Sequence, residues 1–259
     1  MTILKKITDY KKLEVAARMR AFPLSVLKQS TLFERACFSM AKNVAAGSGI
    51  IAEHKRRSPS KSVINENILL PEVVKGYEKA GVSAISVLTD TKFFGGSLDD
   101  LLLARSCVDI PLLRKDFIVD PYQIYEAKAF GADAILLIAA CLEESQLQEY
   151  SALAKELGMD VLLEIHNEEE LKKSLHPNVD LLGVNNRNLK TFEVSLDASK
   201  ALSKLIPDHY VKVSESGIST TEAIQELKPY GYKGFLIGER FMKTENPGKS
   251  AMEFIKALH

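Results

Sequence analysis

Charged side chains stand at the ends of apolar segments in this sequence, where an ordinary buried strand gives no reason for them. The segment 111–120, PLLRKDFIVD, is interrupted by Arg114, Lys115 and Asp116. A strand packed on both faces is almost continuously hydrophobic, because an unpaired buried ammonium loses favourable hydration. Ammonium and carboxyl groups placed in this way can donate and accept protons in a reaction.

Other apolar runs end in the same kinds of group. The polar residues at these ends are Glu53, Lys55, Glu164, Asn185, Arg187, Glu215 and Ser216. Side chains alternate between the two faces of a strand, so Glu53 and Lys55 share a face and His54 takes the other. By the same rule Arg114 and Asp116 point away from Lys115. We interpret this outward pair as a salt bridge between strand and helix layers.

The elements that must position these residues alternate regularly along the chain. Short apolar, β-branched runs predict eight strands at 48–55, 83–89, 110–115, 132–140, 160–165, 180–186, 210–216 and 234–239. Amphipathic segments between them predict helices, among them 69–80, 121–130, 143–158 and 220–231. Eight strand–helix units predict an α/β fold, a closed (βα)8 TIM barrel. An open doubly wound sheet is the alternative, but no GxGxxG turn follows the first run.

The domain prediction is one barrel domain over 1–259, with the barrel at 48–259 and an N-terminal helical extension at 1–47. Pro23 separates two helices within the extension. Parallel barrels carry function at the C-terminal ends of their strands, so the polar run ends converge on one mouth. The alternative is a buried ion-pair network that fixes the barrel, although apolar replacements of such networks are often equally stable.

Glycines follow the last two predicted strands. Gly217 in VSESGIST and Gly238 in LIGERF each lie where the chain leaves a strand. Glycine permits close backbone approach, and N–H groups at a helix start attract an anion. The pair predicts a phosphate site, to which Arg187 adds a charged contact. Taken singly, each glycine is an ordinary turn residue.

Composition restricts the class of partner. The chain has 259 residues, 46% of them hydrophobic, with 34 basic and 34 acidic residues. This balance favours a small ligand over nucleic acid or a membrane surface. Three widely spaced cysteines, no secretory leader pattern and no run of eighteen apolar residues predict a cytoplasmic protein. We expect a monomer, and no metal, because His54 and His166 form no HxH or HxxxH pattern.

Seven segments together resemble the indole-3-glycerol phosphate synthase family. They are EHKRRSPSKS, SVLTDTKFFGGS, LLRKDFIVDPYQI, DVLLEIHNEEEL, GVNNRNLKTFEV, SESGI and FLIGERFM, and they stand in the family's order along essentially the whole chain. Ser62 departs from an expected glycine, and Glu239 lies where serine is also common. Both departures affect the phosphate loops and leave the charged catalytic positions intact.

The resemblance implies a carboxy-lyase of tryptophan biosynthesis that needs no cofactor. Its substrate would be 1-(2-carboxyphenylamino)-1-deoxyribulose 5-phosphate, a sugar phosphate that is closed to an indole with loss of carbon dioxide and water. Lys115 matches the family's acid and Glu164 the carboxyl group of the dehydration. Glu53 would hydrogen-bond the substrate hydroxyls and orient Lys55. The resemblance leaves open how the proton transfers divide between Glu164, Glu53 and Lys55, and Lys55 pairs with the substrate carboxylate in the alternative.

The remaining site residues are predicted to bind substrate. Asn185 and Glu215 would bind the sugar hydroxyls, and Ser58 would bind the carboxylate. The phosphate would be bound by Ser216, Gly217, Gly238 and Glu239. The aromatic ring would contact Phe94, Phe117 and Leu136. Core packing is the alternative for the last three. Two other functions stay open: a sugar-phosphate isomerase on the same scaffold, and a barrel that binds a phosphate ligand without catalysis.

Overall fold

A computed structural model describes residues 2–59, 61–65, 67–188 and 191–258. Eight parallel strands close into a barrel in chain order, which confirms the predicted fold class. The strands are β1 (Ile50–His54), β2 (Ala84–Leu88), β3 (Leu112–Lys115), β4 (Ala134–Ile138), β5 (Asp160–Ile165), β6 (Leu181–Asn185), β7 (Val211–Glu215) and β8 (Tyr232–Ile237).

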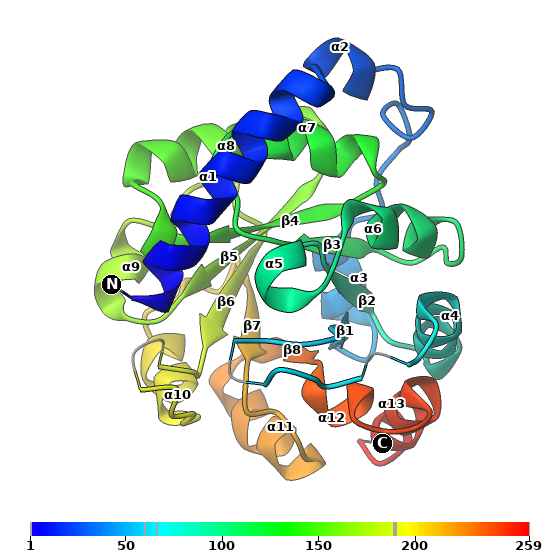
Figure 1. The fold of residues 1–259 in the computed structure, drawn as a ribbon. Helices are drawn as coiled ribbons and strands as arrows, with labels where there is room; N and C mark the ends of the chain where they lie inside the picture. The colour runs from blue at the N-terminus through cyan, green and yellow to red at the C-terminus, as the bar shows by residue number, and fades with distance from the viewer. Residues whose placement is uncertain (1, 60, 66, 189–190, 259) are drawn as a thin grey trace.

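Helices surround this barrel (Figure 1). They are α4 (Leu70–Ala80), α5 (Thr91–Phe94), α6 (Leu98–Arg105), α7 (Tyr122–Ala129), α8 (Glu144–Glu156), α9 (Glu168–Lys172), α10 (Asp197–Ser203), α11 (Thr221–Leu227), α12 (Glu239–Met242) and α13 (Pro247–Lys256), with 3-10 turns η1 (Ala139–Cys141) and η2 (Lys228–Tyr230). The helix predicted for 220–231 ends at Leu227 and continues as the 3-10 turn Lys228–Tyr230, because Pro229 has no N–H to donate within an α-helix. The last strand lies at Tyr232–Ile237, so Glu239 begins a helix.

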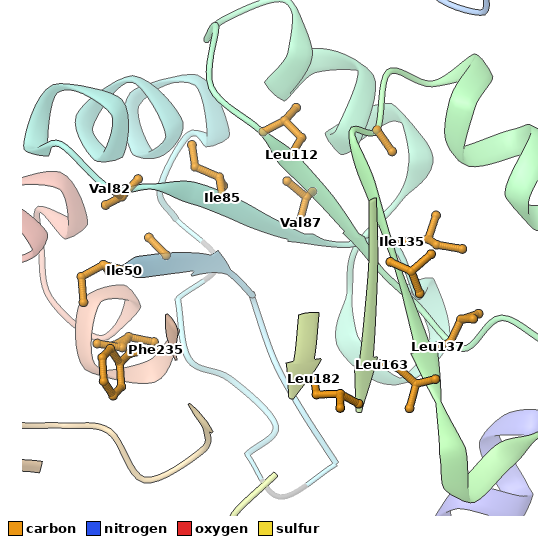
Figure 2. Close-up of a cluster of buried hydrophobic side chains, with 14 of the residues drawn as sticks. Ile50, Val82, Ile85, Val87, Leu112, Ile135, Leu137, Leu163, Leu182 and Phe235 are labelled. Atoms are coloured by element: carbon orange, nitrogen blue, oxygen red, sulfur yellow. The ribbon is translucent and has the colours of Figure 1, made fainter. Parts of the chain in front are cut away.

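The strands bury side chains on both faces. Outward-facing residues such as Ile85, Leu112 and Ile135 pack against the helices in one continuous cluster (Figure 2). Inward-facing residues form a second cluster inside the barrel, which includes Leu113 and Leu162. Burial on both faces explains why the strands read as continuous hydrophobic runs in the sequence.

The extension before β1 holds three helices: α1 (Ile3–Ala21), α2 (Leu24–Leu27) and α3 (Met40–Ala46). Met40 and Val44 of α3 are buried in the inner cluster and close the N-terminal end of the barrel. α1 lies beside α7 (Figure 1) and buries Ile7, Lys11 and Val15, which recur every fourth residue on one face. The opposite, C-terminal end of the barrel is therefore the one left open to a ligand.

Candidate active site

A cavity of about 380 Å³ lies at the C-terminal mouth of the barrel. Every site residue predicted from the sequence lines it: Glu53, Lys55, Ser58, Phe94, Lys115, Phe117, Leu136, Glu164, Asn185, Arg187, Glu215, Ser216, Gly217, Gly238 and Glu239. The convergence follows from the parallel topology, because every strand delivers its last residues to the same end.

Lys115 ends β3 and lies among carboxylates from other strands. Its Nζ is 2.6 Å from Glu215 Oε2 and 3.7 Å from Glu164 Oε2. Burial would lower the pKa of Lys115, but the charges of Glu215, Glu164 and Glu53 raise it above its ordinary value. The ammonium therefore stays protonated, as a proton donor must. The sequence did not indicate that Glu215 would be its nearest partner.

Glu215 ends β7 and is almost completely buried. Burial raises the pKa of Glu215 to about 7; Lys115 opposes this rise and Glu164 adds to it. Glu215 Oε2 accepts from Lys115, whereas Oε1 is buried without a hydrogen-bond partner among the described residues. A buried acceptor without a donor is costly, so Oε1 is suited to a donor that a ligand brings.

Glu53 and Lys55 come from the end of β1, and the structure places them on the same side, as the strand alternation predicts. Lys55 Nζ donates to Glu53 Oε1 at 2.5 Å. Burial would raise the pKa of Glu53, but Lys55 and Lys115 lower it below its ordinary value. This carboxyl group is therefore ionised, in contrast to that of Glu215 near neutral pH.

Two glycines make room for these carboxylates. A Cβ on Gly238 would lie 2.6 Å from Glu53 Oε1, and one on Gly183 would lie 2.4 Å from Glu215 Oε1. At both distances the carboxylate would have to shift to admit a side chain. Gly183, within β6, is a residue that the sequence analysis missed. A glycine inside an otherwise apolar strand marks a close approach, and that was the available signal.

Glu164 is the second-to-last residue of β5, and its Oε2 lies 3.7 Å from Lys115 Nζ. Its Oε1 accepts from Asn185 Nδ2 at 3.1 Å and lies 3.4 Å from His166 Nε2. His166 Nδ1 is in turn 3.1 Å from Glu170. His166 therefore borders the carboxylate network, a position that the sequence did not indicate. No described group of His, Cys, Asp or Glu has the arrangement of a metal site.

The residues that the sequence predicts for an anion site lie on the rim after β7 and β8. Ser216 and Gly217 both have positive φ, at 66° and 79°, so the backbone turns sharply there. Glu239 ion-pairs with Lys61 of the loop after β1, which offsets its negative charge. Arg240 and Lys243 also line the cavity near this rim, and neither was predicted. The rim thus combines a tight turn with cationic side chains.

An apolar wall covers the side of the cavity between β2 and β4. The rings of Phe94 and Phe117 are 5.8 Å apart between centroids. Leu136 of β4 lies nearby in the same lining, and the first turns of α1 add Ile3, Leu4 and Ile7. The α1 residues were missed as site residues, although their spacing gives an apolar face beside the charges.

A (βα)8 barrel with ammonium and carboxyl groups around one mouth defines a barrel enzyme of the proton-transfer class. The sequence then identifies the family. The family model described as Indole-3-glycerol phosphate synthase matches residues 4–254, and the chain belongs to that family. It is an enzyme, a carboxy-lyase of tryptophan biosynthesis that forms indole-3-glycerol phosphate.

Similar proteins support this membership over the full length. The chain is 48% identical over 257 residues to an indole-3-glycerol phosphate synthase of Bacteroides thetaiotaomicron, covering 99% of this chain and 98% of that protein. A synthase of the same name from Polynucleobacter asymbioticus is 45% identical, with coverage of 97% and 98%. Among solved structures, 3-hexulose-6-phosphate synthase from Salmonella typhimurium has a TM-score of 0.64 at 13% identity, with coverage of 81% and 98%, which shows the fold alone.

Proposed function

We propose that the chain closes the pyrrole ring of 1-(2-carboxyphenylamino)-1-deoxyribulose 5-phosphate at this mouth, with Lys115 as the general acid. The aromatic carbon that bears the carboxylate attacks the ketone, whose oxygen gains negative charge. A protonated group within hydrogen-bond reach stabilises that charge. The single observation that carries the proposal is the Lys115 ammonium, which is 2.6 Å from Glu215 and lines the cavity, with its side chain 14% exposed.

Loss of carbon dioxide restores the electron pair to the new ring, and loss of the hydroxyl as water completes the indole. The hydroxyl group must be protonated before it leaves as water, and a base must remove a proton from the new ring. We assign this exchange to Glu164, which shares the cavity with Lys115. Glu53 orients Lys55 through their hydrogen bond. Lys55 then either joins the proton transfers or pairs with the substrate carboxylate before it departs.

The other lining residues hold the rest of the substrate. Asn185 and Oε1 of Glu215, for which the described part of the chain offers no hydrogen-bond donor, suit the sugar hydroxyls. The backbone N–H groups of Ser216, Gly217, Gly238 and Glu239 suit the phosphate, with charge from Arg187, Arg240 and Lys243. Ser58 is assigned to the carboxylate, and Phe94, Phe117 and Leu136 to the aromatic ring.

The assignment is tested by mixing the enzyme with this substrate and following indole fluorescence. Appearance of the indole signal with release of carbon dioxide is expected. A sugar-phosphate isomerase would convert an aldose into a ketose instead, and a binding barrel would give no product at any enzyme concentration. No signal with stoichiometric enzyme would refute the catalytic proposal.

We further propose a cytoplasmic monomer built as a single domain. The cavity residues that the mechanism uses all come from one copy of the chain. Cys37, Cys107 and Cys141 are all free thiols, which suits a reducing compartment. Among the described residues, none of the helices is long and apolar enough to cross a bilayer. Light scattering of the purified protein would test the monomer, and a larger mass would contradict it.

A further inference from the structure

A lysine of α1 is buried outside the cavity among three carboxylates. Lys11 Nζ lies 3.0 Å from Asp90 Oδ2, 3.0 Å from Asp116 Oδ1 and 3.1 Å from Glu14 Oε2, and its side chain is 1% exposed. Burial would lower the pKa of Lys11, but Asp116, Asp90 and Glu14 raise it above its ordinary value. The ammonium is therefore charged and joins three separate elements of the fold.

Each aspartate in turn holds the backbone of an aromatic residue in the cavity wall. Asp90 caps α5, and its Oδ1 accepts from the N–H groups of Phe93 at 2.7 Å and Phe94 at 3.2 Å. Asp116 Oδ1 accepts from the N–H of Phe117 at 2.8 Å. Lys11 thus ion-pairs with the two carboxylates that accept hydrogen bonds from the backbone of Phe94 and Phe117.

The same face of α1 also supplies part of the wall. Ile7 lies one turn before Lys11, and Ile3 lies one turn before Ile7, so all three share a face. Ile3 and Ile7 line the cavity together with the aromatic pair. A shift of Lys11 would therefore move the α1 part of the wall relative to the aromatic pair.

We propose that Lys11 is a positioning residue, whose ammonium aligns the first turns of α1 with Phe94 and Phe117 to form the surface that binds the substrate's aromatic ring. This inference rests on the assignment of that wall to the aromatic end of the substrate. Lys11 touches no reacting atom, and it acts through Asp90 and Asp116. Its contribution is to binding, with the chemistry left to the groups on the strands.

The test is Lys11→Met, with kcat and KM measured separately. Lost binding that is equal in ground state and transition state raises KM alone, so we expect KM to rise about tenfold and kcat to stay within about threefold. Anthranilate, as a probe of the aromatic wall, should inhibit about tenfold more weakly, with inhibition by inorganic phosphate unchanged. The matched control is Lys12→Met, which changes the exposed neighbour on α1 and should alter neither constant.

If Lys11 only stabilised the fold, Lys11→Met would give a different result. It would reduce the amount of folded enzyme, and so the apparent kcat, with KM and the anthranilate constant unchanged; that outcome would overturn the proposal. If Lys11→Met does not fold, Asp90→Asn serves instead, because it keeps a capping oxygen and removes the charge. We expect about a threefold rise in KM for that variant, and an unchanged KM would overturn the proposal. Failure of wild-type turnover would instead refute the proposed function.

Discussion

Two charge clusters lie on opposite faces of β3. The inner cluster faces the cavity and consists of Glu53, Lys55, Lys115, Glu164 and Glu215. The outer cluster faces the helices and consists of Lys11, Glu14, Arg18, Asp90, Arg114, Asp116 and Glu126. Arg114 and Lys115 are adjacent in the chain, and strand alternation sends one to each cluster.

The clusters differ in their access to the cavity. In the outer cluster, Arg114 bridges Asp116 and Glu126 at 3.2 and 3.0 Å, and its side chain is 3% exposed. In the inner cluster carboxylates outnumber ammonium groups, and a cavity adjoins them. The imbalance contributes to raising the pKa of Glu215 to about 7. A charge cluster packed between strand and helices holds the fold together, whereas one that adjoins a cavity can exchange protons with a ligand.

The largest effect on turnover short of removing Lys115 is expected for Glu164→Gln. The amide keeps the shape of the carboxyl group but cannot donate or accept a proton as the dehydration needs. Turnover should fall about a thousandfold, as is typical for loss of a general acid or base. Steady-state fluorescence measures it, with exposed Glu168→Gln as the control. Turnover within about tenfold of wild type would move the role to another carboxyl group.

Arg114→Met tests whether the outer cluster contributes to stability and not to turnover. Breaking a buried ion pair leaves carboxylates without their partner, so the free energy of unfolding should fall by about 3 to 5 kcal/mol. The kcat of the folded fraction should stay within about threefold, because Arg114 does not face the cavity. Urea unfolding and turnover on one preparation measure both. A variant with wild-type stability and lost turnover would contradict the assignment of the outer cluster to stability and the inner cluster to catalysis.

The pKa of Glu215 predicts a pH dependence of stability. A carboxyl group whose folded pKa lies above its unfolded value binds more protons when folded, so its stabilisation is fully present below about 4.5 and is lost as pH rises through about 7. The difference in unfolding free energy between wild type and Glu215→Gln should therefore fall by roughly 3 kcal/mol between pH 4.5 and 8. Parallel stability curves for the two proteins would contradict the raised pKa.

The smallest effect is expected for Gly183→Ala, which adds a methyl group 2.4 Å from Glu215 Oε1. The carboxylate must shift against Lys115, and we expect kcat to fall about tenfold. Gly234→Ala is the matched control, because its Cβ would lie 2.8 Å from the Val213 side chain, remote from the carboxylates. That control should lose stability while its folded fraction keeps kcat. Equal losses of kcat in both variants would attribute the effect to distortion of the barrel.

The fold was predictable because periodicity and topology agree along the whole chain. Parallel strands must bring their ends together, so residues as distant as Glu53 and Glu215 could be assigned to one mouth before any coordinates. Partner choice was not predictable: the pairing of Lys115 with Glu215 depends on side-chain reach across the barrel. The position of α1 beside the cavity was not predictable either. In the sequence, Lys11 belongs to a helix rich in charged residues and resembles a solvent-exposed lysine, and only the structure shows its ion pairs with Asp90 and Asp116.

The most direct test of the account is Lys115→Met. Methionine fills similar space without a charge, so the variant should fold and still bind inorganic phosphate at the rim. We expect its single-turnover rate of indole formation to fall at least about a thousandfold at every substrate concentration. A folded Lys115→Met enzyme that forms indole within about tenfold of the wild-type rate would contradict the assignment of the acid.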